Sequence, residues 1–220
     1  RRFIQACACT VAAGATGGVG YVAMNAPLPA PQPEAAAFLT PVAGSLESGA
    51  PILLVTNSRT TPSFGAYLGA VLRAEGIVAF RSAYLADIQP AVLAQFPLVL
   101  LAAGELTATE SELFEKYVIE GGNLIALRPD RQLAAVMGVR FTGGSTDNMF
   151  LAVGDHSLSA GIVKTALQIH IPVDEYDLSG AETVAWLAYR DGAITSRPAV
   201  TINRAGKGVA ALWAFDLPQS

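Results

Sequence analysis

The segment Pro51-Ile52-Leu53-Leu54-Val55-Thr56-Asn57 decides the fold class of this chain. Its apolar residues form a continuous run, and the run breaks directly into a polar turn. A strand that is buried on both faces has this pattern, which is typical of a parallel sheet covered by helices. Similar apolar runs occupy residues 97–102 and 123–127. We therefore expect several buried, parallel strands.

Helical patterns separate these predicted strands. Residues 63–75 carry apolar side chains at helical spacing, and Gly76 ends that segment. Residues 107–120 begin with the Thr-x-x-Glu spacing of a capping box. We also expect a strand at 77–80 and a helical connection at 87–96. Alternating strands and helices predict an α/β fold, specifically a flavodoxin-like parallel sheet with helices on both faces.

The pattern changes after about residue 139. Strand-like runs now follow one another with short turns between them, and Asp191-Gly192 is a hairpin-type turn. The sequence therefore predicts C-terminal antiparallel strands, at 150–153, 183–189, 199–203 and 209–215.

The first 33 residues differ in composition from the rest. Arg1 and Arg2 are followed by no charged side chain until Glu34. As a helix, Phe3–Met24 would be about 33 Å long, enough to cross a hydrocarbon core of roughly 30 Å. Basic residues stay on the cytoplasmic side of a membrane. Residues 1–25 are thus predicted to be a single-pass anchor in a bacterial inner membrane, with a cytoplasmic N-terminus and a periplasmic domain.

Two alternatives to a retained anchor stay open, namely a cleaved secretory signal and a soluble helix. A cleaved secretory signal also has a basic start and an apolar run, although prolines crowd the candidate cleavage region. The chain could also be the front part of a longer secreted protein. Residues 26–50 are rich in proline and alanine and are predicted to be a linker. Residues 51–220 then form one domain of ordinary size.

Small residues within the predicted anchor point to a membrane partner. Gly14 and Gly18 stand four residues apart, a spacing that lets two helix backbones approach closely in lipid. The hydrophobic content of 52% is high, and an apolar surface covered by a partner would explain part of it. We therefore expect other membrane-protein subunits as partners. With a net charge of −4 and no basic patch, nucleic-acid binding is not expected.

Four segments together resemble the class I glutamine-amidotransferase-like fold. They are Ile52–Asn57, Phe64–Gly76, Phe96–Ala102 and the Tyr117-Val118-x-x-Gly121-Gly122-Asn123-Leu124-Ile125-Ala126-Leu127 stretch. The likeness covers residues 51 to 217 and is strongest to ThuA-like domains of secreted bacterial proteins. Active amidotransferases of this fold carry a cysteine on a sharp turn after a central strand, paired with a histidine. No cysteine follows Cys9, which excludes that mechanism.

Polar residues after the predicted strands form a candidate ligand pocket. The carboxyl ends of strands in such sheets are where ligands bind. An anion or sugar pocket would be built from Asn57, Ser58, Glu105, Arg128 and Asp130. The alternative is an ion pair and a helix start, because Pro129 suits the first turn of a helix.

The two histidines do not indicate a metal site. His156 and His170 have Asp155 and Asp174 near them in sequence, but the spacing matches no known ligand pattern. We predict no metal and no cofactor.

These observations lead to two functional hypotheses. The first is a non-catalytic, membrane-anchored, extracytoplasmic accessory or scaffolding subunit of a larger membrane complex, for example a respiratory or photosynthetic one. This chain would then be a pseudoenzyme. The alternative is an extracytoplasmic sugar- or amide-directed hydrolase, or a carbohydrate-binding module, of the ThuA-like type. A working pocket at Arg128 and Asp130 would favour the alternative.

Overall fold

The computed structural model describes residues 49–57, 64–102 and 104–217. The predicted anchor at 1–25, with Gly14 and Gly18, lies outside these ranges, as do Ser58 and nearly all of the predicted linker. Within these three ranges, no helix is both long enough and apolar enough to span a membrane. The anchor and the periplasmic location therefore stay predictions.

The first half of the described chain alternates strands and helices. Its elements are β1 (Ile52–Thr56), α2 (Phe64–Ala74), β2 (Phe80–Tyr84), η1 (Leu85–Asp87), α3 (Pro90–Leu93), β3 (Leu98–Ala102), α4 (Ala108–Glu120), β4 (Asn123–Leu127) and η2 (Arg131–Leu133). The second half is mostly strands, namely β5 (Val139–Thr146), β6 (Phe150–Val153), η3 (Ser157–Ser159), β7 (Leu167–Gln168), β8 (Val173–Leu178), β9 (Glu182–Ala188), β10 (Ile194–Ala205) and β11 (Gly208–Trp213).

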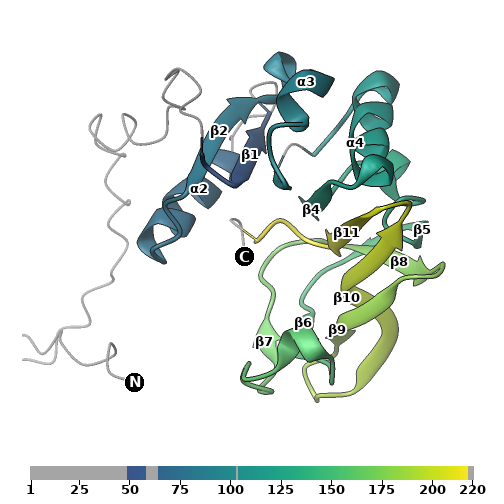
Figure 1. Ribbon diagram of the computed structural model, residues 1–220. Helices are drawn as coiled ribbons and strands as arrows, with labels where there is room; N and C mark the ends of the chain where they lie inside the picture. Colours follow the sequence, from purple (N-terminus) through teal and green to yellow (C-terminus); the bar gives the residue numbers. More distant parts are fainter. Residues whose placement is uncertain (1–48, 58–63, 103, 218–220) are drawn as a thin grey trace, which may run out of the picture. The chain divides into compact units, whose positions relative to one another are not determined.

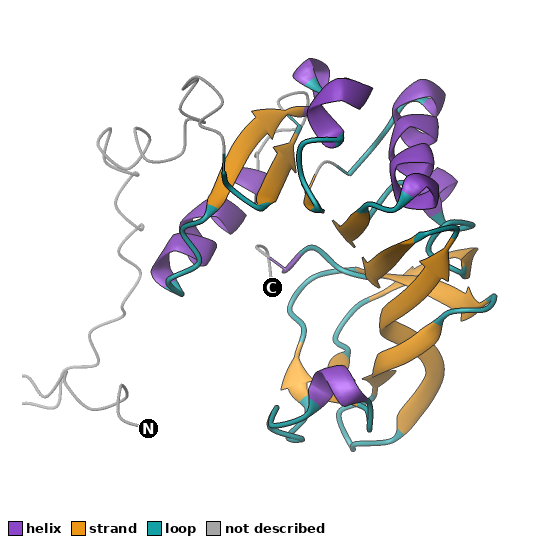
Figure 2. Ribbon diagram, in the orientation of Figure 1, coloured by secondary structure: helices purple, strands orange, loops and turns teal. Residues whose placement is uncertain are grey.

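The strands form one mixed nine-stranded sheet and a separate two-stranded ribbon (Figures 1 and 2). The order in the large sheet is β2-β1-β3-β4-β11-β10-β9-β6-β7. The pairs from β2 to β11 are parallel, and those from β11 to β7 are antiparallel. The ribbon pairs β5 with β8 in antiparallel fashion. The expected mixed α/β fold with C-terminal antiparallel strands is confirmed.

Helices pack on both faces of the parallel half. Leu54 of β1 is buried against Leu68 of α2. Its neighbours Leu53 and Val55 belong to the main core, which also contains Phe114 of α4. Successive side chains of a strand point to opposite faces, so α2 and α4 cover opposite faces of the sheet. The apolar run of β1 is continuous because both faces of the strand are buried.

Two local expectations need correction. The predicted strand at 77–80 is displaced, because β2 begins only at Phe80. Ile77 and Val78 instead lie in the connection after α2, with 43% and 70% of their surfaces exposed. Neither β5 nor β8 was expected. In β5 only Val139 is buried and mostly polar residues and glycines follow it, and in β8 two acidic residues separate the buried Val173 and Tyr176. The capping box of α4 is present as predicted.

Candidate functional site

The parallel strands β1, β3, β4 and β11 end at one edge of the sheet, called here the carboxyl edge. Arg128 follows β4 directly at this edge, and its backbone φ is 41°. Among the described residues other than glycine, only Asn148 also has a positive φ. A positive φ is unfavourable for a side chain larger than that of glycine. Such strain persists only where the surrounding structure holds it, and it concentrates at functional sites.

Arg128 is held at this turn by Asp174, the second residue of β8. Nε and Nη2 of Arg128 both donate to Oδ1 of Asp174, at 3.1 and 2.9 Å. The end of β11 fixes both backbones, since Arg128 N donates to Trp213 O and Asp174 N donates to Ala214 O. The two side chains remain 34% and 18% exposed. Within the described part of the chain, Nη1 of Arg128 and Oδ2 of Asp174 have no partner, which leaves a donor and an acceptor for a ligand.

Asp130 accepts hydrogen bonds from two backbone N–H groups. Its Oδ2 accepts from Leu106 N at 3.1 Å, and its Oδ1 accepts from Gln132 N at 2.9 Å. Gln132 Nε2 donates back to Leu106 O at 3.0 Å. Asp130 thus caps η2 and joins the loop after β3 to the loop after β4. Arg128 forms its ion pair with Asp174 and not with Asp130, and Asp130 rather than Pro129 begins the short helix.

The other predicted pocket residues lie at the same edge. Asn57 is 3% exposed, and its Nδ2 donates to Glu105 O at 3.4 Å. Since Glu105 precedes Leu106, Asn57 and Asp130 both hold the loop after β3. The structure therefore brings Asn57, Glu105, Arg128 and Asp130 to the carboxyl edge, whereas Ser58 lies outside the described residues. The role of Asp174 was missed, because the sequence places it far from Arg128.

Tyr176, two residues after Asp174 in β8, is buried and only 1% exposed. Burial raises the pKa of its hydroxyl well above the ordinary value, the negative charge of Asp174 raises it further, and Arg128 partly opposes this. Its ring packs against Phe141, with 5.6 Å between the ring centroids. Tyr176 therefore stays neutral at any physiological pH and serves as an apolar support for β8.

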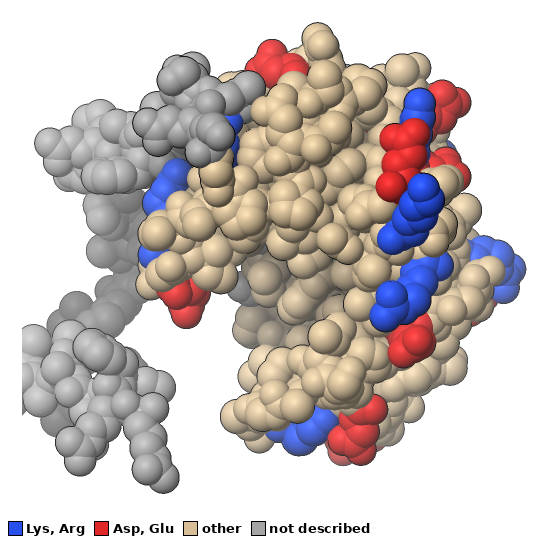
Figure 3. Space-filling model, viewed as in Figure 1, with Lys and Arg blue, Asp and Glu red and all other residues tan. Residues whose placement is uncertain are grey.

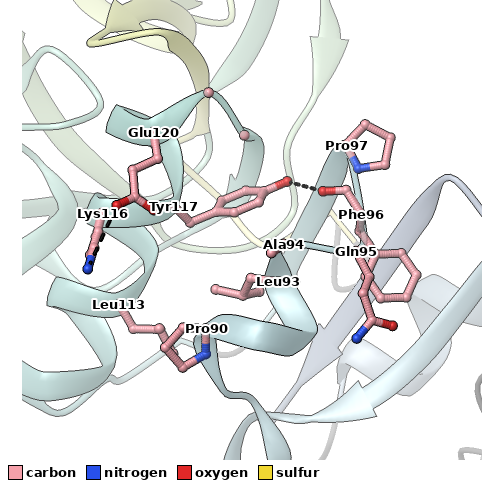
Figure 4. A pocket seen from close by; sticks show the side chains of 12 residues that line it. Pro90, Leu93, Ala94, Gln95, Phe96, Pro97, Leu113, Lys116, Tyr117 and Glu120 are labelled. Carbon is pink, nitrogen blue, oxygen red and sulfur yellow. Dashed lines mark hydrogen bonds and ion pairs between the residues drawn. The ribbon is translucent and has the colours of Figure 1, made fainter.

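A pocket of about 470 Å³ lies between α3 and α4 (Figure 4). Its lining is mixed, with the apolar Leu93 and Leu113 on facing helices and the ion pair of Lys116 and Glu120 in the same wall. Tyr117 crosses the pocket and donates its hydroxyl hydrogen to Phe96 O at 2.8 Å. Burial raises the pKa of Tyr117 to about 12. The pocket lies at the opposite, amino end of the parallel strands, because Pro97 and Gly122 in its lining precede β3 and β4.

A second pocket, of about 310 Å³, lies against β9 and β10. It is lined by His156, Ser157, Leu158, Gly180, Glu182, Ile202, Asn203, Arg204 and Val209. None of the predicted carboxyl-edge residues contributes to either of these two pockets.

The candidate metal ligands considered from sequence are not brought together. His156 contacts Glu182, Asp174 contacts Arg128, and Asp155 contacts Lys164. Among the described residues, no group of three or more histidine, cysteine or acidic side chains is arranged to hold a metal ion.

No protein-family model matches the sequence, and no curated protein matches it either. Solved structures share the fold at low identity. A β-galactosidase of Rahnella sp. R3 aligns with a TM-score of 0.58 and 17% identity, over 76% of this chain and 28% of the enzyme. The carbohydrate deacetylase Agd3 aligns with a TM-score of 0.55 and 13% identity, over 74% of this chain and 28% of that protein.

One neighbour is similar to this chain in length as well. A cytoplasmic protein of Salmonella typhimurium aligns with a TM-score of 0.54 and 14% identity, over 75% of this chain and 87% of its own. The fold can therefore make up nearly a whole protein. By contrast, this chain spans little more than a quarter of the galactosidase and the deacetylase, so the likeness is to one part of each enzyme.

These neighbours contradict the expectation of a non-catalytic accessory subunit in a membrane complex. Structures with this fold include carbohydrate-active enzymes, so the predictions of a pseudoenzyme and of a scaffolding role are wrong. The absence of a cysteine after Cys9 excludes amidotransferase chemistry, but it does not exclude hydrolysis by other groups. A thiol is needed for amidotransferase chemistry, whereas glycoside hydrolysis uses carboxylates as acid, base or nucleophile.

Proposed function

We propose that this chain is a carbohydrate-directed hydrolase domain whose sugar site lies at the carboxyl edge of the sheet, around Arg128 and Asp174. The observation that carries the proposal is the strained turn at Arg128, held by Asp174 with a donor and an acceptor left over. The sugar-directed enzymes among the structural neighbours support it.

We further propose that the fold is of the flavodoxin-like, amidotransferase-like kind. The order of the parallel strands, β2-β1-β3-β4-β11, supports this, because flavodoxin-like sheets have the order 2-1-3-4-5. In such sheets the ligand binds beyond the carboxyl ends of the strands, near the point where the order reverses. Here the reversal lies between β1 and β3, and Asn57 and the loop of Glu105 follow those two strands.

The turn at Arg128 supports the same assignment. It follows a central strand and precedes a short helix, the position where the resembled family places its nucleophile. In this chain the residue there is an arginine, which offers a guanidinium instead of a nucleophile. A sugar hydroxyl both donates and accepts, so different hydroxyl groups of one sugar can donate to Oδ2 of Asp174 and accept from Nη1 of Arg128.

We assign the chemical roles accordingly. Oδ2 of Asp174 acts as the general base toward the attacking water, and the Arg128 guanidinium stabilises negative charge that develops on the substrate. Asp130 and Asn57 position the loops and do not touch the substrate. The bond broken is the acyl bond of an acylated sugar. Water adds to the acyl carbon, Asp174 takes the proton of that water and passes it to the leaving oxygen or nitrogen of the sugar, and Arg128 stabilises the oxyanion.

The experiment measures binding by calorimetry, and turnover, for lactose and for N-acetylated glucosamine oligomers with the full chain. Arg128→Lys removes the forked donor, and Asp174→Asn removes the base. Each is expected to lower the affinity or kcat/KM at least about tenfold. Arg140→Ala is the matched control, because it removes an arginine–aspartate pair at an exposed site elsewhere. A folded wild-type chain that neither binds nor cleaves any of these sugars would overturn the proposal.

The extracytoplasmic location also stays part of the proposal, supported by the composition of residues 3–24. To test the location, single cysteines are introduced into the 51–220 domain, and intact cells are treated with a thiol reagent that does not cross the inner membrane. Labelling only after the cells are broken would place the domain in the cytoplasm.

A further inference from the structure

The pocket against β9 and β10 combines fixed polar groups with an apolar wall. Glu182 of β9 stands opposite Ile202 of β10 in the sheet register. Arg204 follows Ile202 by two residues and therefore lies on the same face, opposite Val209 of β11. His156 and Leu158, at the start of η3, complete the lining. Figure 2 shows η3 as a short purple helix among the antiparallel strands.

The orientation of His156 is fixed by two contacts. Its Nδ1 accepts the backbone N–H of Leu158 at 3.1 Å, so the neutral ring carries its hydrogen on Nε2. Nε2 lies 3.3 Å from Oε2 of Glu182 and donates to it. The ring is only 15% exposed. His156 is therefore a positioning residue for the Glu182 carboxylate. It does not resemble the histidine of a catalytic triad, in which Nδ1 donates and Nε2 accepts, because here Nδ1 accepts and Nε2 donates.

The charges at the pocket are of both signs and are not paired with each other. The Glu182 side chain is 74% exposed, and among the residues that the structure describes its one hydrogen-bonding partner is His156. Arg204 is exposed, and within the described part of the chain it has no ion pair or hydrogen bond. The pocket thus presents a positioned acceptor, a free donor and the apolar side chains of Leu158, Ile202 and Val209.

We propose that this pocket binds one neutral sugar unit, as a second carbohydrate subsite distinct from the carboxyl edge. The sugar hydroxyls donate to Glu182 and accept from Arg204, and a C–H face of the ring packs on Leu158 and Val209. An anion would meet the Glu182 carboxylate and a cation would meet Arg204, whereas a hydroxyl group satisfies both. A volume of about 310 Å³ accommodates a single small ligand of this kind.

The subsite and the backbone of Arg128 contact opposite ends of β11. Val209 lines the pocket near the start of β11, and Trp213 at its end holds the backbone of Arg128. With a rise of about 3.3 Å per residue, these two positions are roughly 13 Å apart. The subsite can therefore be occupied or lost independently of the carboxyl edge.

The test titrates the full chain, labelled at its isoleucine, leucine and valine methyl groups, with the methyl glycosides of galactose, glucose and mannose. We expect saturable shifts of the methyl resonances of Leu158, Ile202 and Val209. Glu182→Gln and Arg204→Met should each weaken this binding at least fivefold. Arg140→Met is the control for loss of an exposed arginine, and Arg128→Lys should leave these shifts unchanged.

Three outcomes would overturn the subsite. The first is the absence of shifts at these methyl groups with all three glycosides at concentrations up to about 50 mM, where even weak sugar binding is detectable. The second is undiminished binding by folded Glu182→Gln and Arg204→Met. The third is tighter binding of glycine or alanine, whose opposite charges also match the pocket, than of any glycoside. A special case of the second outcome, in which the shifts also disappear with Arg128→Lys, would assign the sugar binding to the carboxyl edge.

Discussion

The ring of Tyr117 occupies the space that a side chain at position 122 would need. A Cβ on Gly122 would stand 2.2 Å from Cζ of that ring. The ring cannot move away freely, because its hydroxyl donates to Phe96 O at 2.8 Å. We expect Gly122→Ala to lower the free energy of unfolding in urea by about 1–3 kcal/mol, as overpacking does.

The control is Gly144→Ala. There an added Cβ would meet its nearest atom, on Glu175, at an ordinary contact distance of 3.7 Å. Equal urea midpoints for the two variants would show that the α3–α4 packing tolerates the added methyl group.

Tyr117 should also make the stability of the fold depend on pH in the alkaline range. Burial raises the pKa of Tyr117 from 10.0 to about 12 in the folded chain, so between these values the folded state holds a proton that the unfolded state has lost. Stability must therefore fall as the pH rises from 10 to about 12. Unfolding midpoints measured across that range should decline less steeply for Tyr117→Phe than for the wild type. Parallel declines would mean that other groups, among them Tyr176, account for the whole effect.

The capping box at the start of α4 should be measurable by itself. Thr107 Oγ1 accepts from Glu110 N at 3.3 Å, and Glu110 Oε2 accepts from Thr107 N at 2.8 Å. Thr107→Ala removes one half of this exchange and should cost about 1 kcal/mol of stability. Thr109→Ala, two residues along on the exposed side of the same helix, should be neutral or slightly stabilising. Identical unfolding curves for both variants would contradict the role of the cap.

Asp130 should matter for the order of the carboxyl edge. Asp130→Ala leaves the backbone N–H groups of Leu106 and Gln132 without their acceptor, and Leu106 is 8% exposed. We expect a loss of about 1–3 kcal/mol and faster hydrogen exchange at the Leu106 amide. Asp87→Ala, at an exposed position with no interaction among the described residues, should change neither quantity. Unchanged exchange at Leu106 would show that the loop after β3 does not depend on Asp130.

The elements that sequence predicts well are those whose pattern has a single physical cause. The apolar runs of β1, β3 and β4 reflect burial on both faces, and the Thr107-to-Glu110 spacing reflects a local exchange of hydrogen bonds. β5 and β8 carry no such pattern. Each packs one side on the core and turns charged residues such as Arg140 and Asp177 outward, where these two form an ion pair with each other. That pairing joins residues far apart in sequence, so local periodicity does not reveal it.

The candidate site shows the same division. Strand ends place Asn57, Glu105, Arg128 and Asp130 at one edge, and this follows from a parallel sheet alone. The pairing of Arg128 with Asp174 depends instead on where β8 lies relative to β11. The sequence contains no repeated spacing that links those residues, and the positive φ of Arg128 has no compositional mark such as glycine. Long-range contacts of this kind require the tertiary structure.

The position of β11 has a consequence for synthesis on the ribosome. It is the last described strand in sequence, yet it lies in the interior of the sheet, between β4 and β10. Until residues 208–213 have left the exit tunnel, β4 has an open hydrogen-bonding edge and β10 lacks one of its neighbours. The nascent chain therefore exposes an unpaired, largely apolar strand edge until β11 emerges, and such an edge can pair with another chain.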